Sequence, residues 1–114
     1  LTEGVANMDN VASQMGQIGV KDKSLIWNTD LIEAMELENL VGQALVTIRS
    51  ADQRAESRGA HAHEDWPERD DENWMKHTVM WLDEQNRSTV GYRSVAMNTL
   101  SNDVAPIPPA PRVY

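Results

Sequence analysis

Two histidines and two carboxylates lie within five residues near the middle of the chain, and all four are side chains that bind metal ions. The segment reads His61, Ala62, His63, Glu64, Asp65. Zinc takes imidazole and carboxylate ligands. Histidines two positions apart point to the same side only in a strand, and no distant third ligand is evident. The pattern favours a solvated or interface-bound loop, while a small metal-dependent hydrolase using His61, His63 and the acidic loop remains a hypothesis.

A cluster of carboxylates continues from this segment. Its members are Glu64, Asp65, Glu68, Asp70, Asp71 and Glu72. Paired carboxylates can perform general acid–base catalysis or bind calcium, but the glycine of a calcium-binding loop is missing. We therefore interpret the cluster as a hydrated surface that pairs with Arg69 and Lys76. No nucleophile elbow surrounds Ser57, and there is no phosphate-binding loop or dinucleotide fingerprint, so no complete active site is evident.

The composition narrows the possible function classes. The chain has 114 residues, enough for one domain, and a formal net charge of -8. Such a charge is unsuited to binding nucleic-acid phosphates or an anionic membrane surface. The absence of cysteine excludes disulfides and cysteine-based zinc sites, and no apolar run approaches the roughly 20 residues that span a bilayer. Because the chain begins at Leu1, we expect it to be cut from a longer protein.

Two helices are expected in the first half of the chain. Residues 1–18 place apolar side chains every three or four positions, which is typical of one helix face. A longer helix is expected from the capping types at residues 28–30, with Asp30 and Glu33 as a capping box. It would end at Gly59, with Arg54 and Arg58 in its last turn.

The long helix carries a continuous apolar stripe. Its members are Leu31, Met35, Leu40, Ala44, Leu45, Ile48, Ala51 and Ala55, widened by Ile32 and Val41. At 1.5 Å per residue the helix would be roughly 40 Å long, and one short partner helix cannot cover such a stripe. We therefore expect a further helix upstream of Leu1, and we expect the exposed stripe to promote self-association of an isolated fragment.

The second half of the chain is expected to be mostly irregular, with one β-hairpin. A polar loop over 59–76 is predicted to contain a helical turn near 70–75. The β-branched and aromatic residues of 77–82 and 88–95 predict two strands joined by a turn, with His77 half-buried. The prolines beyond residue 105 predict an extended tail. Interface contacts and internal packing remain equally open for the tryptophans, which are Trp27, Trp66, Trp74 and Trp81.

Several of these segments together resemble one protein family. The segments run from Trp27 to Leu31, Glu36 to Leu40, Glu56 to His61, Glu64 to Asp65, Pro67 to Trp74, Lys76 to Thr78, and Pro108 to Tyr114. They are similar to the C-terminal segment of flavoproteins of the succinate dehydrogenase and fumarate reductase family. The Lys76-His77-Thr78 segment and the Pro-Pro ending favour the succinate dehydrogenase branch. Many members have arginine at the position of His63, so this histidine is not expected to be essential.

The resemblance implies a mainly α fold. It consists of antiparallel helices of a spectrin-like bundle without its first helix (residues 1–58), followed by a polar loop, a small β-hairpin and an extended Pro-rich tail (residues 59–114). The segment would be a non-catalytic domain that packs on the FAD-binding domain of the same subunit. The full-length subunit would oxidise succinate to fumarate and pass electrons through FAD to an iron–sulfur subunit and quinone. Its location would be the cytoplasmic side of a bacterial inner membrane or the mitochondrial matrix side.

No catalytic, FAD-binding or metal-binding residue is carried over to this chain, because the family's counterparts belong to the larger N-terminal part. No FAD is expected in this segment by itself. We expect Glu56, Arg58 and His61, the anchor residues, to hold the loop after the long helix against the rest of the subunit. The alternative is a free-standing acidic helical adaptor that binds a basic partner.

Overall fold

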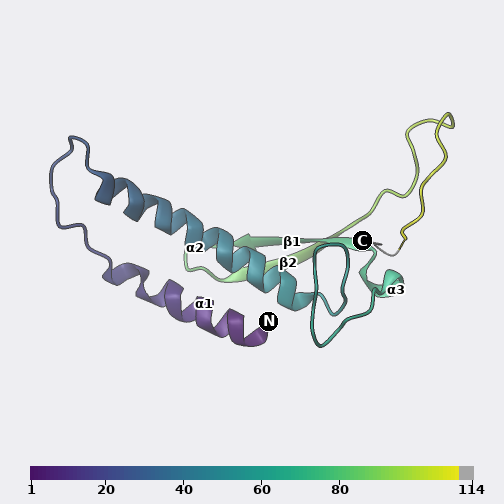
Figure 1. The fold of residues 1–114 in the computed structure, drawn as a ribbon, viewed down its shortest axis with the longest axis horizontal. Coiled ribbons are helices and arrows are strands. Elements are labelled where there is room, and N and C mark those ends of the chain that lie inside the picture. Colours follow the sequence, from purple (N-terminus) through teal and green to yellow (C-terminus); the bar gives the residue numbers. More distant parts are fainter. Residues whose placement is uncertain (111–114) are drawn as a thin grey trace.

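The structure is a computed structural model that describes residues 1–110, and it combines an antiparallel helix pair with a two-stranded sheet (Figure 1). The elements in chain order are α1 (Thr2–Gln14), the 3₁₀ turn η1 (Met15–Gln17), α2 (Thr29–Gln53), α3 (Asp71–Trp74), β1 (Lys76–Leu82) and β2 (Ser88–Ser94). Helix α1 lies along one side of α2, and the hairpin lies along another. The expected mixture of helices and one hairpin is confirmed.

Helix α1 packs closely against the C-terminal half of α2. A Cβ atom added to Gly4 would lie 2.7 Å from Ile48 Cδ1, so the missing side chain permits this close approach. Polar contacts reinforce the pairing: Thr2 Oγ1 donates to Asp52 Oδ1 at 3.0 Å, and Arg49 pairs with Asp9 at 2.6 Å. Helix α1 and η1 together end at Gln17, close to the predicted end of this helix.

The start of α2 is set by Asn28 rather than by the predicted capping box of Asp30 and Glu33. Asn28 Oδ1 accepts a hydrogen bond from the Leu31 N–H at 2.9 Å, which satisfies a helix N-terminal donor. Asn28 Nδ2 donates to the carbonyl oxygens of Asp22 and Ser24 at 3.0 and 2.8 Å. This buried side chain therefore ties the incoming loop to the helix, whereas Asp30 lies in the first turn.

The end of α2 differs from the prediction by about a turn and a half. The helix ends at Gln53, and Arg54 adopts an extended conformation with φ -90° and ψ 102°. Gly59, the predicted stop, instead has a φ of 59°. It lies in a tight turn in which Arg58 and His61 exchange backbone hydrogen bonds of 2.8 and 3.0 Å. The glycine is therefore needed for a loop turn, not for a helix cap.

Burial along the apolar stripe of α2 is uneven. Val41 and Leu45 are buried, with Leu45 completely inaccessible. Toward the N-terminal end, Ile32, Met35 and Leu40 are 56 to 64% exposed. The described residues therefore cover only the C-terminal half of the stripe, in keeping with the expectation that one short helix is too small a partner.

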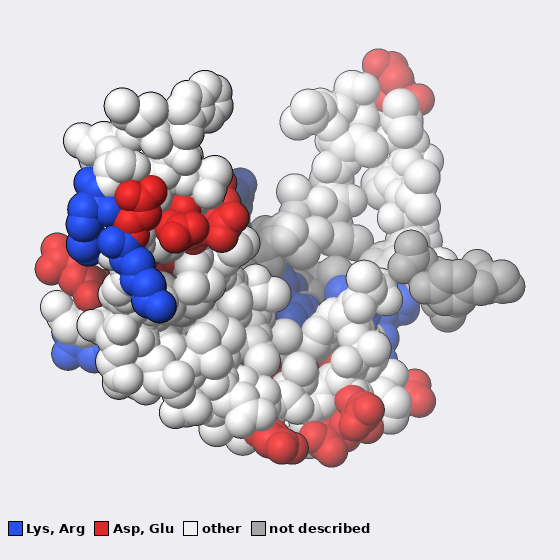
Figure 2. All heavy atoms as spheres, turned by 60° about the vertical axis from the view of Figure 1, so that its left-hand side comes forward, with Lys and Arg blue, Asp and Glu red and all other residues white. Residues whose placement is uncertain are grey.

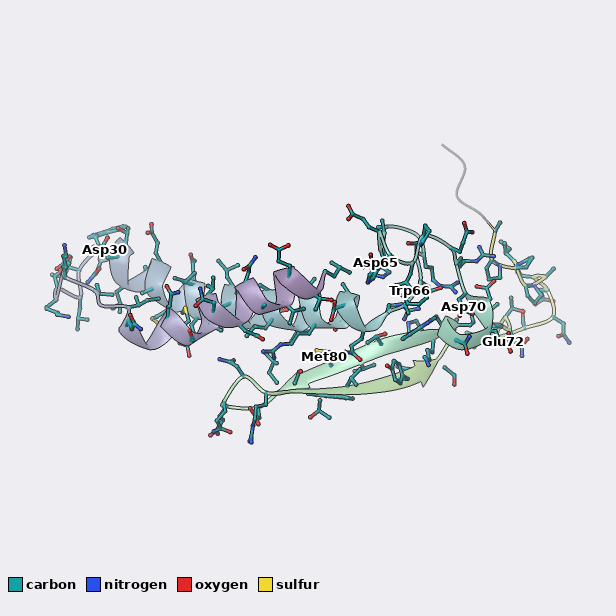
Figure 3. All side chains as sticks on the ribbon, turned by 90° about the horizontal axis from the view of Figure 1, so that it is seen from below. Asp30, Asp65, Trp66, Asp70, Glu72 and Met80 are labelled. Atoms are coloured by element: carbon teal, nitrogen blue, oxygen red, sulfur yellow. The ribbon has the colours of Figure 1, made fainter. Side chains whose placement is uncertain are left out.

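The predicted hairpin forms with one face toward α2. Its strands pair antiparallel, with Lys76 opposite Ser94 and Leu82 opposite Ser88. Met80 lies between the hairpin and the helix, 3.7 Å from Ser50 Oγ (Figure 3). Successive strand residues alternate between faces, so His77 and Trp81 lie on the outer face. His77 is exposed, and the expectation that it is half-buried is therefore wrong.

Beyond Ser94 the chain forms no further helix or strand as far as residue 110. This segment leaves the hairpin as an arm and then turns back (Figure 1). Pro109 and Ala110 finally line a pocket with Ser57 and Arg58. The last part of the predicted Pro-rich tail, residues 111–114, lies outside the described residues.

No helix within residues 1–110 combines the length and the apolar character needed to cross a bilayer.

The uneven burial of α2 leads to a stability prediction. Leu45→Ala in the 114-residue chain should lower the free energy of unfolding by about 2 to 5 kcal/mol, because it removes a fully buried side chain. Leu40→Ala, at a position 64% exposed, should change it by less than about 0.5 kcal/mol. Urea unfolding followed by circular dichroism measures both. Equal losses would contradict the described burial.

Candidate functional site

A buried carboxylate is the centre of the segment that follows α2. The side chain of Glu56 is completely inaccessible to solvent. Its Oε1 accepts hydrogen bonds from Arg54 Nη2 and, at 2.9 Å, from Arg58 Nε. Its Oε2 accepts from Arg58 Nη2 and from the Asp70 N–H, each at 3.0 Å. Both oxygens are therefore fully used, as a buried charge requires.

Arg54 connects this carboxylate to the start of the hairpin. Besides Glu56, its guanidinium donates to the carbonyl oxygens of Trp74 and Lys76 at 2.7 and 2.8 Å and to Thr78 Oγ1 at 3.0 Å. These acceptors belong to α3 and β1. One side chain therefore joins the end of α2 to two later elements, and the extended backbone at Arg54 directs it there.

Arg58 connects the same carboxylate to the N-terminus of α3. It pairs with Asp71 at 2.7 Å, and its Nη2 lies 3.3 Å from the Asp70 carbonyl oxygen. The Asp70 carboxylate in turn accepts from the Glu72 and Asn73 N–H groups and so caps α3 (Figure 3). The helical turn predicted near residues 70–75 is thus confirmed, and Glu56 and Arg58 hold its N-terminus.

The two histidines of the segment proposed above as a metal-ligand candidate contact other groups of the same loop. His63 is buried, and its backbone N–H donates to Ser57 Oγ at 2.9 Å. His61 is half-buried, with Nε2 3.4 Å from the Arg54 carbonyl oxygen. Within residues 1–110 no three His, Cys, Asp or Glu side chains are grouped closely enough to hold a metal ion. The described part of the chain thus offers no geometry for the metal-dependent hydrolase hypothesis.

The acidic cluster only partly follows its predicted pairing. Arg69 pairs with Asp71 at 3.0 Å, as expected. Lys76, however, has no carboxylate partner among residues 1–110. Its Nζ lies 4.8 Å from the ring centroid of Trp74 and 4.2 Å from that of Tyr92. The aromatic rings attract this ammonium group through cation–π interactions, so this part of the pairing prediction is wrong.

The structure brings the anchor residues Glu56, Arg58 and His61 into one loop at the C-terminal end of α2. Sequence reasoning missed Arg54 and Asp70 as their partners, because it assigned Arg54 to the last turn of the helix. The spacing of Arg54, Glu56 and Arg58 did carry a signal. Residues two apart share a face only in extended backbone, so an Arg-x-Glu-x-Arg ion-pair set argues against helix at these positions.

The pKa values of Glu56 and Arg58 are shifted from their ordinary values. Burial by itself would raise the pKa of Glu56, but hydrogen bonds from Arg58, Arg54 and the Asp70 N–H outweigh burial and lower the pKa to about 2. The hydrogen bond to Glu56 raises the pKa of Arg58. A carboxylate that is ionised, buried and fully hydrogen-bonded at neutral pH is a poor proton acceptor. The arrangement therefore organises the backbone and is unsuited to acid–base catalysis.

The chain is similar in sequence to known flavoproteins. The whole chain, residues 1–114, matches the family model described as "Fumarate reductase flavoprotein C-term". It is 53% identical to the succinate dehydrogenase flavoprotein subunit of Rickettsia bellii over 114 residues, which are 100% of this chain and 19% of that protein. It is 49% identical to the mitochondrial succinate dehydrogenase flavoprotein subunit of Oryza sativa, covering 100% of this chain and 18% of that protein.

A solved structure shows the same fold. A quinol fumarate reductase chain from E. coli superposes with a TM-score of 0.78 and 32% sequence identity. The matched region covers 85% of this chain and 17% of that chain. The chain thus spans about a fifth of the length of the relatives that it matches.

The lowered pKa of Glu56 predicts that the stability of the fold decreases at acidic pH. The ionised carboxylate stabilises the fold above its unfolded pKa of about 4.5, and this contribution is lost as the pH falls toward about 2. A shift of this size corresponds to roughly 3 kcal/mol. Glu56→Gln should lower the free energy of unfolding at pH 7 and flatten its pH dependence between pH 5 and 2.

The measurement is urea unfolding of the 114-residue chain at a series of pH values. Glu64→Gln, at an exposed position of the same loop, serves as the control because it removes the same charge. It should leave the pH dependence close to that of the parent chain. An unchanged slope for Glu56→Gln would contradict the assignment.

Proposed function

Because this chain belongs to the family of fumarate reductase flavoprotein C-terminal segments, we propose that it is the C-terminal, non-catalytic domain of the flavoprotein subunit of a succinate dehydrogenase. The full-length subunit would oxidise succinate to fumarate with FAD. Electrons would then pass to an iron–sulfur subunit and to quinone. The two relatives described above at about half identity carry the succinate dehydrogenase name.

One observation carries this proposal. The chain is matched from its first residue to its last, yet it corresponds to only about a fifth of the length of those flavoproteins. A segment of this size, whose buried carboxylate Glu56 is ionised and fully hydrogen-bonded, is suited to a supporting role. The substrate and redox chemistry would reside in the remaining four fifths.

The residues of this chain do not fit FAD. A dinucleotide fingerprint is missing from the sequence. The first turns of the two longer helices carry Glu3 and Asp30, and carboxylates there disfavour a bound pyrophosphate. We therefore assign flavin binding to the rest of the subunit.

The proposed role of this domain is to pack against the FAD-binding domain of the same subunit. Residues 1–58 would form two helices of a spectrin-like bundle, and a further helix from elsewhere in the subunit would cover the open half of the α2 stripe. Residues 59–114 would complete the same structural unit. The hydrogen bonds from Arg54 to the hairpin and from Glu56 to Asp70 support treating both parts as one unit.

The anchor residues would hold the loop after α2 in the shape that meets the FAD-binding domain. Glu56 is wholly inside the chain, whereas the Arg58 side chain is 25% exposed and His61 is half-buried. Arg58 and His61 can therefore reach a neighbour while Glu56 positions Arg58. By this proposal the subunit associates peripherally with a membrane complex, on the cytoplasmic side of a bacterial inner membrane or on the matrix side in mitochondria.

The test uses a full-length flavoprotein that carries this chain as its C-terminal segment. Arg58→Ala should weaken the docking of the segment, because it leaves the buried Glu56 charge without its main partner. A lower yield of flavin-containing subunit and a lower midpoint of thermal unfolding are expected. Arg93→Ala removes the same charge from an exposed position of β2 and is the control.

Two outcomes would overturn the proposal. Equal assembly and stability for Arg58→Ala and Arg93→Ala would exclude Arg58 as an anchor. Reduction of a dye acceptor by the 114-residue chain alone, supplied with FAD and succinate, would exclude a purely supporting role. If deleting the segment from the full-length protein left a stable flavoprotein, that result would support the free-standing adaptor hypothesis instead.

A further inference from the structure

A pocket of about 400 Å³ opens between the end of α2 and the start of the hairpin. Arg54, Arg58, His61 and Lys76 all contribute to its lining. No aspartate or glutamate lines it, although the chain as a whole carries a net charge of -8. Figure 2 shows Lys and Arg atoms in the hollow beside the C-terminal arm, and a second group of Lys and Arg atoms, next to Asp and Glu atoms, on the opposite side of the molecule. This pocket is therefore a basic site on an acidic molecule.

Two of the basic groups retain capacity for a further partner. Arg58 Nη1 has only the weakly accepting Met75 Sδ at 4.0 Å, and no oxygen among residues 1–110 accepts from it. The Lys76 ammonium group contacts the ring faces of Trp74 and Tyr92, which cannot replace an anion as a partner. Both Nη atoms of Arg54, by contrast, already donate to Glu56, to α3 and to β1.

The rest of the lining is partly polar, from Ser50, His77 and Thr78, and partly apolar. Ala51, Trp74, Met75 and Val95 form the apolar part of the wall. A small inorganic anion would leave these side chains in contact with water. An apolar side chain next to a carboxylate would cover them and pair with the basic groups at the same time.

We propose that this pocket receives an Asp or Glu side chain, with an adjacent apolar residue, from the FAD-binding part of the same subunit. This inference rests on the proposed function. It identifies the kind of group that Arg58, one of the anchor residues, would contact outside this chain. The incoming carboxylate contacts Lys76 Nζ and Arg58 Nη1, while the apolar residue packs on Trp74 and Met75. The rings hold the lysine in place before docking, which reduces the entropy lost when the ion pair forms.

A zero-length cross-link tests this pairing. A water-soluble carbodiimide joins a lysine amine to a touching carboxylate as an amide and takes up the released water as a urea. Applied to the full-length flavoprotein that carries this chain, it should link Lys76 to an Asp or Glu outside residues 1–114, identified by mass spectrometry of the digest. Lys76→Arg should lose this link, because a guanidinium group does not form the amide under these conditions. The urea-denatured subunit should not form it either.

A matched pair of variants tests the energetic role of the charge. Lys76→Arg keeps the positive charge and should change the rate of limited proteolysis within this segment by less than about twofold. Lys76→Met keeps much of the apolar stem but removes the charge, and should raise that rate at least about fivefold. The protease is one that does not cleave at lysine. Raising the salt concentration should speed cleavage of the parent and of Lys76→Arg, but not of Lys76→Met.

The failure of this inference is distinguishable from failure of the proposed function. If deletion of the segment leaves a stable flavoprotein, the proposed function fails and the inference fails with it. If the segment is required but Lys76 forms no link beyond residues 1–114, or links only within them, the inference alone is overturned. A salt response of Lys76→Met equal to that of the parent would overturn it as well.

Discussion

The buried carboxylate of Glu56 is the constraint on which the second half of the chain depends. Removing a charged group from water is costly unless its oxygens find donors. Here those donors come from Arg54, Arg58 and the Asp70 N–H. Because the three donors lie on different segments, satisfying one side chain arranges the helix end, the loop and the N-terminus of α3 together. The same requirement explains why α2 ends before Arg54.

The helical half depends on a different and weaker interaction. Only Val41 and Leu45 form a buried apolar core among the described residues, and the rest of the stripe on α2 stays partly open. Domains with so little buried apolar surface are marginally stable by themselves. By the proposed function, the rest of a larger flavoprotein would supply the missing apolar partner, while the hydrogen bonds of Glu56 would preserve the shape of the loop after α2.

Much of the element pattern was predictable because it rests on local periodicity. The spacing of Val5, Met8 and Ala12 predicted α1, and the β-branched and aromatic residues of β1 predicted the hairpin. A helical turn was predicted near residues 70–75, and the structure shows Asp70 as its N-cap. The predicted end of α2 was wrong because helix propensity favours continuation of the helix through residues 54–58. The buried Glu56 carboxylate, which pairs with Arg54 and Arg58 and accepts from the distant Asp70 N–H, overrides that local preference, and no local pattern measures its strength.

The sequence by itself determined the two longer helices, the hairpin and the resemblance to a flavoprotein family. These follow from short-range spacing and from residue types, which can be read from the sequence without knowledge of the fold. Only the tertiary structure decided that Glu56 is buried, that Lys76 lies on aromatic rings rather than on a carboxylate, and that a basic pocket forms beside them. Each of these depends on residues that the fold brings together across the loop after α2 or across the hairpin, and burial sets the strength of a charge interaction only after the chain has folded.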